Sequence, residues 1–88
     1  MNPDKIAQNL AVKFAEVTDN EPINVIIQME GGLLPEDEKI ILEAGGRIKS
    51  KLYIIDAYAA TLKVGELKNL TEHNRIKKIY FDGEVRAI

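Results

Sequence analysis

Two pairs of glycines, at residues 31–32 and 45–46, divide the middle of this chain into three short segments. The segment before the first pair, residues 23–29, alternates between two sets of side chains, as a strand with one buried face does. The segment between the pairs begins with Pro35 and three acidic residues and continues with apolar residues at helical spacing. A strand, a short helix and a second strand are therefore expected in that order.

The second half of the chain shows the same kinds of pattern. Residues 47–55 and 57–62 both alternate, which predicts two strands joined by a hairpin turn at Asp56-Ala57. Helical spacing predicts a helix over residues 64–74, and a last alternating run predicts a strand over residues 76–81. In the first of the alternating runs, one face carries Ile48, Ser50, Leu52 and Ile54.

An amphipathic helix is expected ahead of these elements. Over residues 2–17 apolar side chains recur at spacings of three and four residues. Asn2 is suited to cap this helix, and Pro3 is tolerated in its first turn. Residues 18–22 are polar turn formers followed by a proline, so they are interpreted as a linker.

The order of these elements predicts the fold class. A helix followed by β-α-β-β-α-β is the pattern of an α+β, ferredoxin-like sandwich, with a four-stranded antiparallel sheet, two helices on one face and an extra N-terminal helix. We expect residues 1–21 to form the first helix and the linker, and residues 22–82 to form the sandwich. Residues 83–88 lack a period and are expected to be a C-terminal tail.

The composition argues against an enzyme. The chain has no cysteine, one histidine, His73, and one serine, Ser50, whereas a hydrolytic triad needs a nucleophile and a base within hydrogen-bond reach. The acidic residues 36–38 are interpreted as a charged first helical turn rather than as metal ligands. Neither glycine pair has the spacing of a nucleotide-binding loop. We therefore expect no catalytic residue, no metal and no cofactor.

Charge and hydropathy argue against nucleic acid and membranes as partners. The formal net charge is -2, so the overall balance does not favour a polyanion. Residues 1–19 mix charged and apolar side chains, unlike a signal peptide or a membrane span. The protein is expected to be intracellular if Met1 is its natural start, and secreted if a signal peptide precedes it.

The sheet face opposite the helices is expected to be apolar. Antiparallel sheets often keep a polar face toward solvent, so an apolar one suggests a docking surface for another protein. Two alternatives remain open, because the N-terminal helix can cover this face or two copies can pair through it. By alternation the face carries Ile26, Tyr53, Ile55, Ala57, Ala59 and Tyr80.

A family resemblance runs through the same region. From residue 45 to residue 88 the chain resembles the subtilisin propeptide family, also named inhibitor I9, and residues 23–29 are similar to the family's first strand. Residues 1–21 have no counterpart in it. The matching motifs, in the family's order and spacing, are Gly45-Gly46, Ile55-Asp56-Ala57, Ala60-Thr61-Leu62, Glu66-Leu67-Lys68 and Phe81-Asp82.

The resemblance implies a binding mode. In that family the open sheet face packs on two surface helices of the protease, an acid after the last strand caps those helices, and the tail lies in the substrate cleft. Asp82 takes the capping role here, while Tyr80 stands where the family has a second acid. The tail residues Val85, Arg86, Ala87 and Ile88 would occupy protease subsites S4 to S1 in that order, with Val85 and Ile88 as anchors.

The resemblance implies a subtilisin-like serine protease as partner, and leaves the biological form of the inhibitor open. A propeptide of this kind also acts as an intramolecular chaperone for its protease, whereas a free-standing inhibitor uses the same contacts and must survive the protease. A ferredoxin-like fold also serves as a small-ligand or RNA-binding module, although an RNA-binding sheet normally has stacking aromatics in a basic surround. We expect an independently folded monomer.

Overall fold

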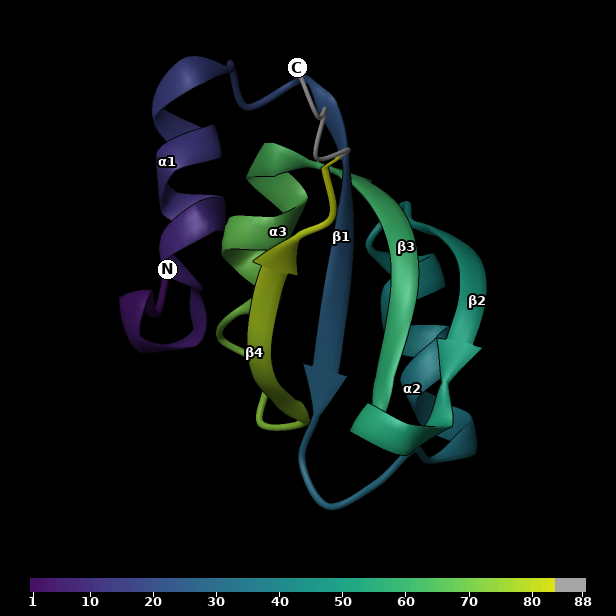
Figure 1. The fold of residues 1–88 in the computed structure, drawn as a ribbon. Helices are drawn as coiled ribbons and strands as arrows, with labels where there is room; N and C mark the ends of the chain where they lie inside the picture. The colour runs from purple at the N-terminus through teal and green to yellow at the C-terminus, as the bar shows by residue number, and fades with distance from the viewer. Residues whose placement is uncertain (84–88) are drawn as a thin grey trace, which may run out of the picture.

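Four strands and three α-helices make up the computed structural model, which describes residues 1–83 (Figure 1). Two short 3-10 helices, η1 and η2, accompany them. In chain order the elements are η1 (Pro3–Lys5), α1 (Gln8–Glu16), β1 (Pro22–Met29), α2 (Pro35–Glu43), β2 (Arg47–Leu52), η2 (Tyr53–Ile55), β3 (Ala57–Lys63), α3 (Val64–Leu70) and β4 (Ile76–Phe81).

The four strands form one antiparallel sheet in the order β2-β3-β1-β4. The strands β1 and β3 are adjacent although an α-helix and another strand lie between them in the sequence, which is the arrangement of the split βαβ motif. This confirms the α+β, ferredoxin-like sandwich with an extra helix.

The core lies between the sheet and the helices α2 and α3, which Figure 1 shows behind the sheet. Alternate residues of β1 point into it, and the buried Tyr58, Ala60 and Leu62 lie opposite them on β3. The predicted inward set of β1, with Ile23, Val25, Ile27 and Met29, is thus confirmed as buried. Burial of such a face is what selects one strand register over its neighbours.

The single helix predicted over residues 2–17 is wrong. A 3-10 turn comes first, then Ile6 and Ala7 are extended, and α1 begins at Gln8. The extended pair adds to the sheet: Ile6 bridges Ile79 in parallel, and the Ala7 N–H donates to the Ile79 carbonyl oxygen at 2.9 Å. A hydrogen bond to a strand edge therefore replaces a helical turn, which periodicity alone does not predict.

The strand predicted over residues 47–55 is also wrong in part. It ends at Leu52, and a bulge between Ile48 and Ser50 shifts its pairing with β3. Ile48 packs against the core, but Ser50 and Leu52 pair with residues of β3 that face away from the helices. A bulge places one extra residue in a strand, so the side chains beyond it change face.

The last predicted helix is shorter than expected, because α3 ends at Leu70 rather than at residue 74. The buried Thr71 hydroxyl donates to the Lys68 carbonyl oxygen at 2.7 Å, and the His73 N–H donates to Leu70 at 3.0 Å. These bonds close the final turn and direct the chain into β4. Hydroxyl-to-backbone bonds of this kind compete with helix continuation.

Candidate functional site

The candidate site is the sheet face that α2 and α3 leave uncovered, here termed the open face. Its members are set by strand register: residues that pair with one another across the strands lie on the same side of the sheet. From β2 to β4 the open face carries Ser50, Leu52, Ala57, Ala59, Thr61, Asn24, Ile26, Gln28, Lys78 and Tyr80.

Small side chains make the middle of the open face hollow. Ala57 is 0% exposed and Ala59 is 7% exposed, although neither points into the core. They are recessed between larger neighbours on the adjoining strands. Beside them lies a shallow apolar hollow of about 350 Å³, lined by Ile26, Gln28, Ile55 and Tyr80.

Four of the six residues predicted for this face lie on it, namely Ile26, Ala57, Ala59 and Tyr80. Ile55 borders the hollow from η2 rather than from a strand. Tyr53 does not join them, because it lies in η2 beside the connection that leads into α2, near Leu33, Leu34 and Pro35. The sequence interpretation did not include the other six members, of which Ser50 and Leu52 join the face only through the bulge in β2.

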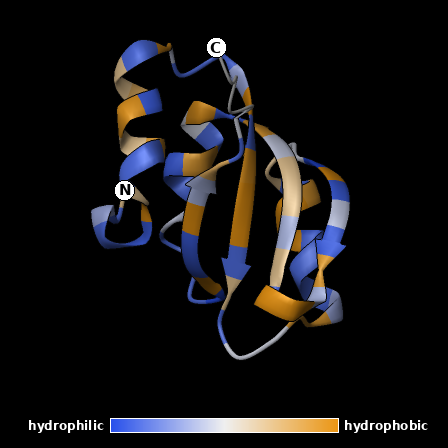
Figure 2. Ribbon diagram, in the orientation of Figure 1, coloured by the Kyte–Doolittle hydropathy of each residue, from blue (hydrophilic) through white to orange (hydrophobic). Residues whose placement is uncertain are grey.

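The short helix η2 is an apolar projection at one end of the sheet, and Figure 2 shows its hydrophobic character. Ile54 is 100% exposed, Tyr53 is 69% exposed and Ile55 is 47% exposed. Gln28 Nε2 donates to the Ile55 carbonyl oxygen at 3.1 Å, which ties η2 to β1. Asp56 follows in a left-handed conformation with φ 53°, and its carbonyl oxygen accepts the Met29 N–H at 2.8 Å.

Asp82, the predicted capping acid, follows β4 directly. Its N–H donates to the Asn24 carbonyl oxygen at 2.9 Å, which continues the pairing of β4 with β1 for one more residue. Its side chain is exposed, and within residues 1–83 it forms no ion pair. The carboxylate is therefore free to accept hydrogen bonds from another molecule. The tail residues Val85, Arg86, Ala87 and Ile88 lie outside the described residues.

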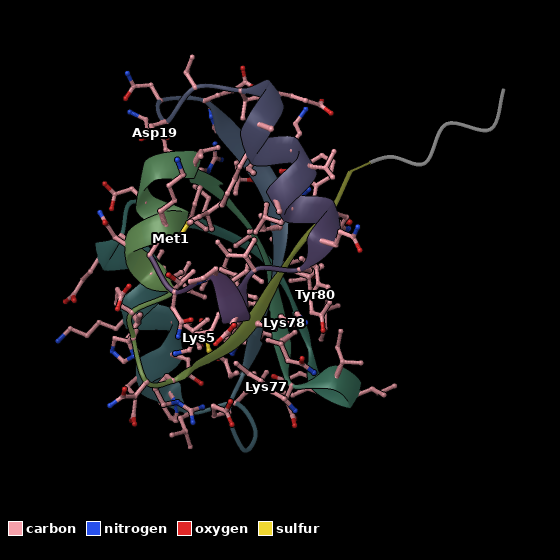
Figure 3. All side chains as sticks on the ribbon, turned by 90° about the vertical axis from the view of Figure 1, so that its left-hand side faces the viewer. Met1, Lys5, Asp19, Lys77, Lys78 and Tyr80 are labelled. Atoms are coloured by element: carbon pink, nitrogen blue, oxygen red, sulfur yellow. The ribbon has the colours of Figure 1, made fainter. Side chains whose placement is uncertain are left out.

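The helix α1 does not cover the open face. It lies beside the outer edge of β4, where Leu10 is buried in the core and Phe14 packs against it (Figures 1 and 3). The Asn9 side chain pairs with the backbone of Phe81 as a neighbouring strand would. Its Oδ1 accepts the Phe81 N–H at 3.1 Å and its Nδ2 donates to the Phe81 carbonyl oxygen at 3.0 Å. Of the three hypotheses for this face, coverage by the N-terminal helix is thus wrong.

The acidic first turn of α2 is built into the structure rather than offered to a ligand. Asp37 is buried and accepts two hydrogen bonds from Arg75 and one from the Leu34 N–H. Glu38 pairs with Lys51 of β2 at 2.9 Å, which raises the pKa of that lysine. Among residues 1–83 no three histidine, cysteine or acidic side chains lie close enough together to hold a metal ion.

His73 lies in the turn between α3 and β4, three residues beyond the end of the helix. Its Nδ1 accepts the Arg75 N–H at 3.1 Å, so the ring is a hydrogen-bond acceptor within a turn.

In the part of the chain that the structure describes, no helix is long and apolar enough to cross a membrane. A scan against models of protein families finds no match to this chain, and a search of curated proteins finds none either.

Proposed function

We propose that this protein binds and inhibits a subtilisin-like serine protease through the open face, Asp82 and the C-terminal tail, and that it is not an enzyme. The observation that carries the proposal is a sheet face that all three α-helices leave uncovered and whose middle, around Ile26, Ala59 and Tyr80, is apolar. A monomeric protein seldom leaves such a face free unless another surface covers it in function. The likeness of residues 22–88 to the inhibitor I9 family supports a protease as the partner.

The recessed middle of the open face can accommodate a helix of the docking partner. Ala57 and Ala59 are recessed, so the backbone of a helix can approach β3 closely between Ile26 on one side and Leu52 on the other. Close backbone approach over small side chains increases the number of dispersion contacts that each residue makes. Tyr80 adds an amphipathic side chain, a type that is enriched at interfaces because it is large and carries a polar end.

Asp82 is placed to meet the ends of such helices. It lies at the end of the β4 row that contains Lys78 and Tyr80, and its exposed carboxylate forms no ion pair among residues 1–83. A helix N-terminus presents unpaired N–H groups and positive potential, both of which a carboxylate satisfies. On this proposal the tail binds in the substrate cleft, where an extended peptide can add to a strand of the protease.

The test is a steady-state titration of the full chain into a subtilisin, with a second chain that lacks residues 85–88. We expect potent inhibition by the full chain and loss of inhibition without the tail. If neither form inhibits any of several subtilisin-like proteases at micromolar concentration, and neither binds them, the proposal is overturned.

A variant on the open face tests docking of the sheet separately from binding of the tail in the substrate cleft. Ala59→Arg places a long cation in the hollow of the open face, and we expect it to weaken inhibition at least tenfold. Leu42→Arg is the matched control, because Leu42 is 57% exposed on α2, in the opposite layer of the sandwich. Equal inhibition by both variants would show that the open face takes no part in binding.

Persistence of inhibition distinguishes a propeptide from a free-standing inhibitor. Both would use the same docking face, but a propeptide is degraded after it has served its protease, whereas a free-standing inhibitor resists degradation. Resistance to proteolysis requires that the domain opens rarely. A time course of residual inhibition, with electrophoresis of the chain, assigns the protein to one class or the other.

A further inference from the structure

The helix η2 exposes more apolar side chain than the fold requires. Three consecutive large residues, Tyr53, Ile54 and Ile55, project from the end of the sheet. Ile54 is 100% exposed, so its side chain does not pack in the core. Together with Leu52 they form one continuous apolar surface. Adjacent exposed residues of this size mark interaction sites more often than isolated ones do.

The same segment is held in a fixed conformation. The Asp56 N–H closes the 3-10 turn on the Tyr53 carbonyl oxygen at 3.3 Å, and Gln28 and Met29 of β1 bond to its C-terminal end. A projection that is ordered before binding loses little conformational entropy when a partner covers it. No described residue covers Ile54. The hydrogen bonds of η2 therefore hold an apolar side chain in solvent rather than in the core.

A cation on the open face lies beside Gln28, the β1 residue that bonds to this projection. Lys78 pairs across β4 and β1 with Gln28, the residue whose amide group holds η2. Within residues 1–83 Lys78 forms no ion pair, whereas Lys51, the other lysine near η2, is paired with Glu38. Figure 3 shows Lys78 and Tyr80 on the side of the sheet from which η2 projects.

We propose that η2 is the anchor of the docking face, and that it inserts Ile54 into an apolar recess of the protease surface whose rim carries a carboxylate opposite Lys78. The inference rests on the proposed function, and it adds the chemistry that selects one protease over another. An apolar anchor supplies affinity when its recess is desolvated, and a charge at its border excludes surfaces with a cation at the same place.

The experiment measures binding rather than inhibition, so the tail and the cleft do not obscure the result. The full chain is titrated by calorimetry into a subtilisin-like protease that it inhibits, inactivated by replacement of its nucleophilic serine with alanine. Ile54→Ser is expected to weaken binding about thirtyfold, the scale of an interface hot spot, and Lys78→Glu at least fivefold. The control variants Leu42→Ser and Lys39→Glu change a similar apolar residue and a similar cation on α2, and neither is expected to alter the affinity.

The outcomes separate the two proposals. If the unaltered chain does not bind the protease, the proposed function fails first. If it binds and Ile54→Ser binds equally well, the anchor proposal alone is overturned. Two further measurements also overturn it: self-association of the unaltered chain that Ile54→Ser abolishes, or Ile54-dependent binding to vesicles of phosphatidylcholine and phosphatidylserine. Because Ile54 is fully exposed, its replacement should leave the thermal unfolding of the domain unchanged.

Discussion

Arg75 forms a bidentate ion pair with Asp37, in which Nε lies 2.8 Å from Oδ1 and Nη2 lies 2.9 Å from Oδ2. The same guanidinium donates to the carbonyl oxygens of Glu30 and Gly32, so one side chain joins the start of β4 to the connection between β1 and α2. Asp37 in turn accepts the Leu34 N–H at 2.7 Å and fixes the start of α2. The pair therefore fixes the end of the sheet from which η2 projects.

Loss of Arg75 is expected to destabilise the domain strongly. Arg75→Met leaves the Asp37 carboxylate, which is 0% exposed, without its cation, and breaking a buried pair in this way costs about 3–5 kcal/mol. Urea unfolding followed by circular dichroism measures the loss. Arg47→Met removes an exposed arginine of β2 and serves as control, with an expected change below about 0.5 kcal/mol. Equal stability of the two variants would contradict the structural role of the pair.

The ion pair also predicts how stability depends on pH. Burial raises the pKa of Asp37, but the hydrogen bonds from Arg75 and Leu34 and the charge of Arg75 lower it more, so the pKa lies below its ordinary value of 3.8. A carboxyl group with a depressed pKa in the folded state stabilises the protein above its unfolded pKa, and this stabilisation is lost as the pH falls through the folded pKa.

Asp37→Asn isolates this contribution. The difference in unfolding free energy between the unaltered chain and Asp37→Asn should be largest at neutral pH and should shrink below about pH 4. Urea titrations at a series of pH values measure it, and Asp4→Asn, an exposed substitution, serves as the reference. A difference that stays constant down to pH 2 would contradict the depressed pKa.

Asn9 is expected to protect the end of β4. Asn9→Ala removes both side-chain hydrogen bonds to the backbone of Phe81, which together contribute about 1–2 kcal/mol. Hydrogen exchange of the Phe81 amide should accelerate, while exchange in β3 should change only as far as global stability does. Gln8→Ala is the control, because Gln8 is exposed one residue earlier. Unaltered exchange at Phe81 would show that Asn9 does not cover the strand edge.

Two glycine-to-alanine substitutions are expected to act in opposite directions. A methyl group at Gly46 would lie 2.7 Å from Ile41 Cγ2 and 2.9 Å from Leu62 Cγ, so Gly46→Ala should destabilise the domain by about 1–3 kcal/mol. At Gly65, in α3, the nearest atoms lie 3.4 Å away on Asp19, an ordinary contact, so Gly65→Ala should stabilise it by up to about 1 kcal/mol. Thermal unfolding of both variants tests the pair, and changes of the same sign would contradict it.

The chain is expected to fold alone as a monomer. Its core is a contiguous cluster that draws on the sheet, on all three α-helices and on both halves of the sequence. Circular dichroism should show cooperative thermal unfolding, and sedimentation equilibrium should give the monomer mass of 9.9 kDa. A random-coil signal at room temperature, or a mass of two chains, would contradict this expectation and favour pairing through the open face.

The sequence by itself determined the order and type of the main elements and the apolar middle of the open face. Alternation in β1, β3 and β4, the charged start of α2 and the glycines after it are local signals, and each acts through neighbours a few residues away. Ile26, Ala57, Ala59 and Tyr80 were placed correctly because the stretches of strand that contain them keep a period of two. The register shift between β4 and β1 lies before Lys78, so it does not change the face of Tyr80.

Only the tertiary structure decided the features that depend on distant partners. The extended pair at Ile6 and Ala7 exists because β4, over seventy residues away, offers an open edge. The bulge in β2 moves Leu52 to the open face and ends the strand before Tyr53, so η2 becomes a projection. Asp37 was expected to be a charged first-turn residue, and its burial depends on Arg75, whose approach no local period encodes. Contacts across such separations form only when the whole sheet is assembled, which is why the sequence pattern did not show them.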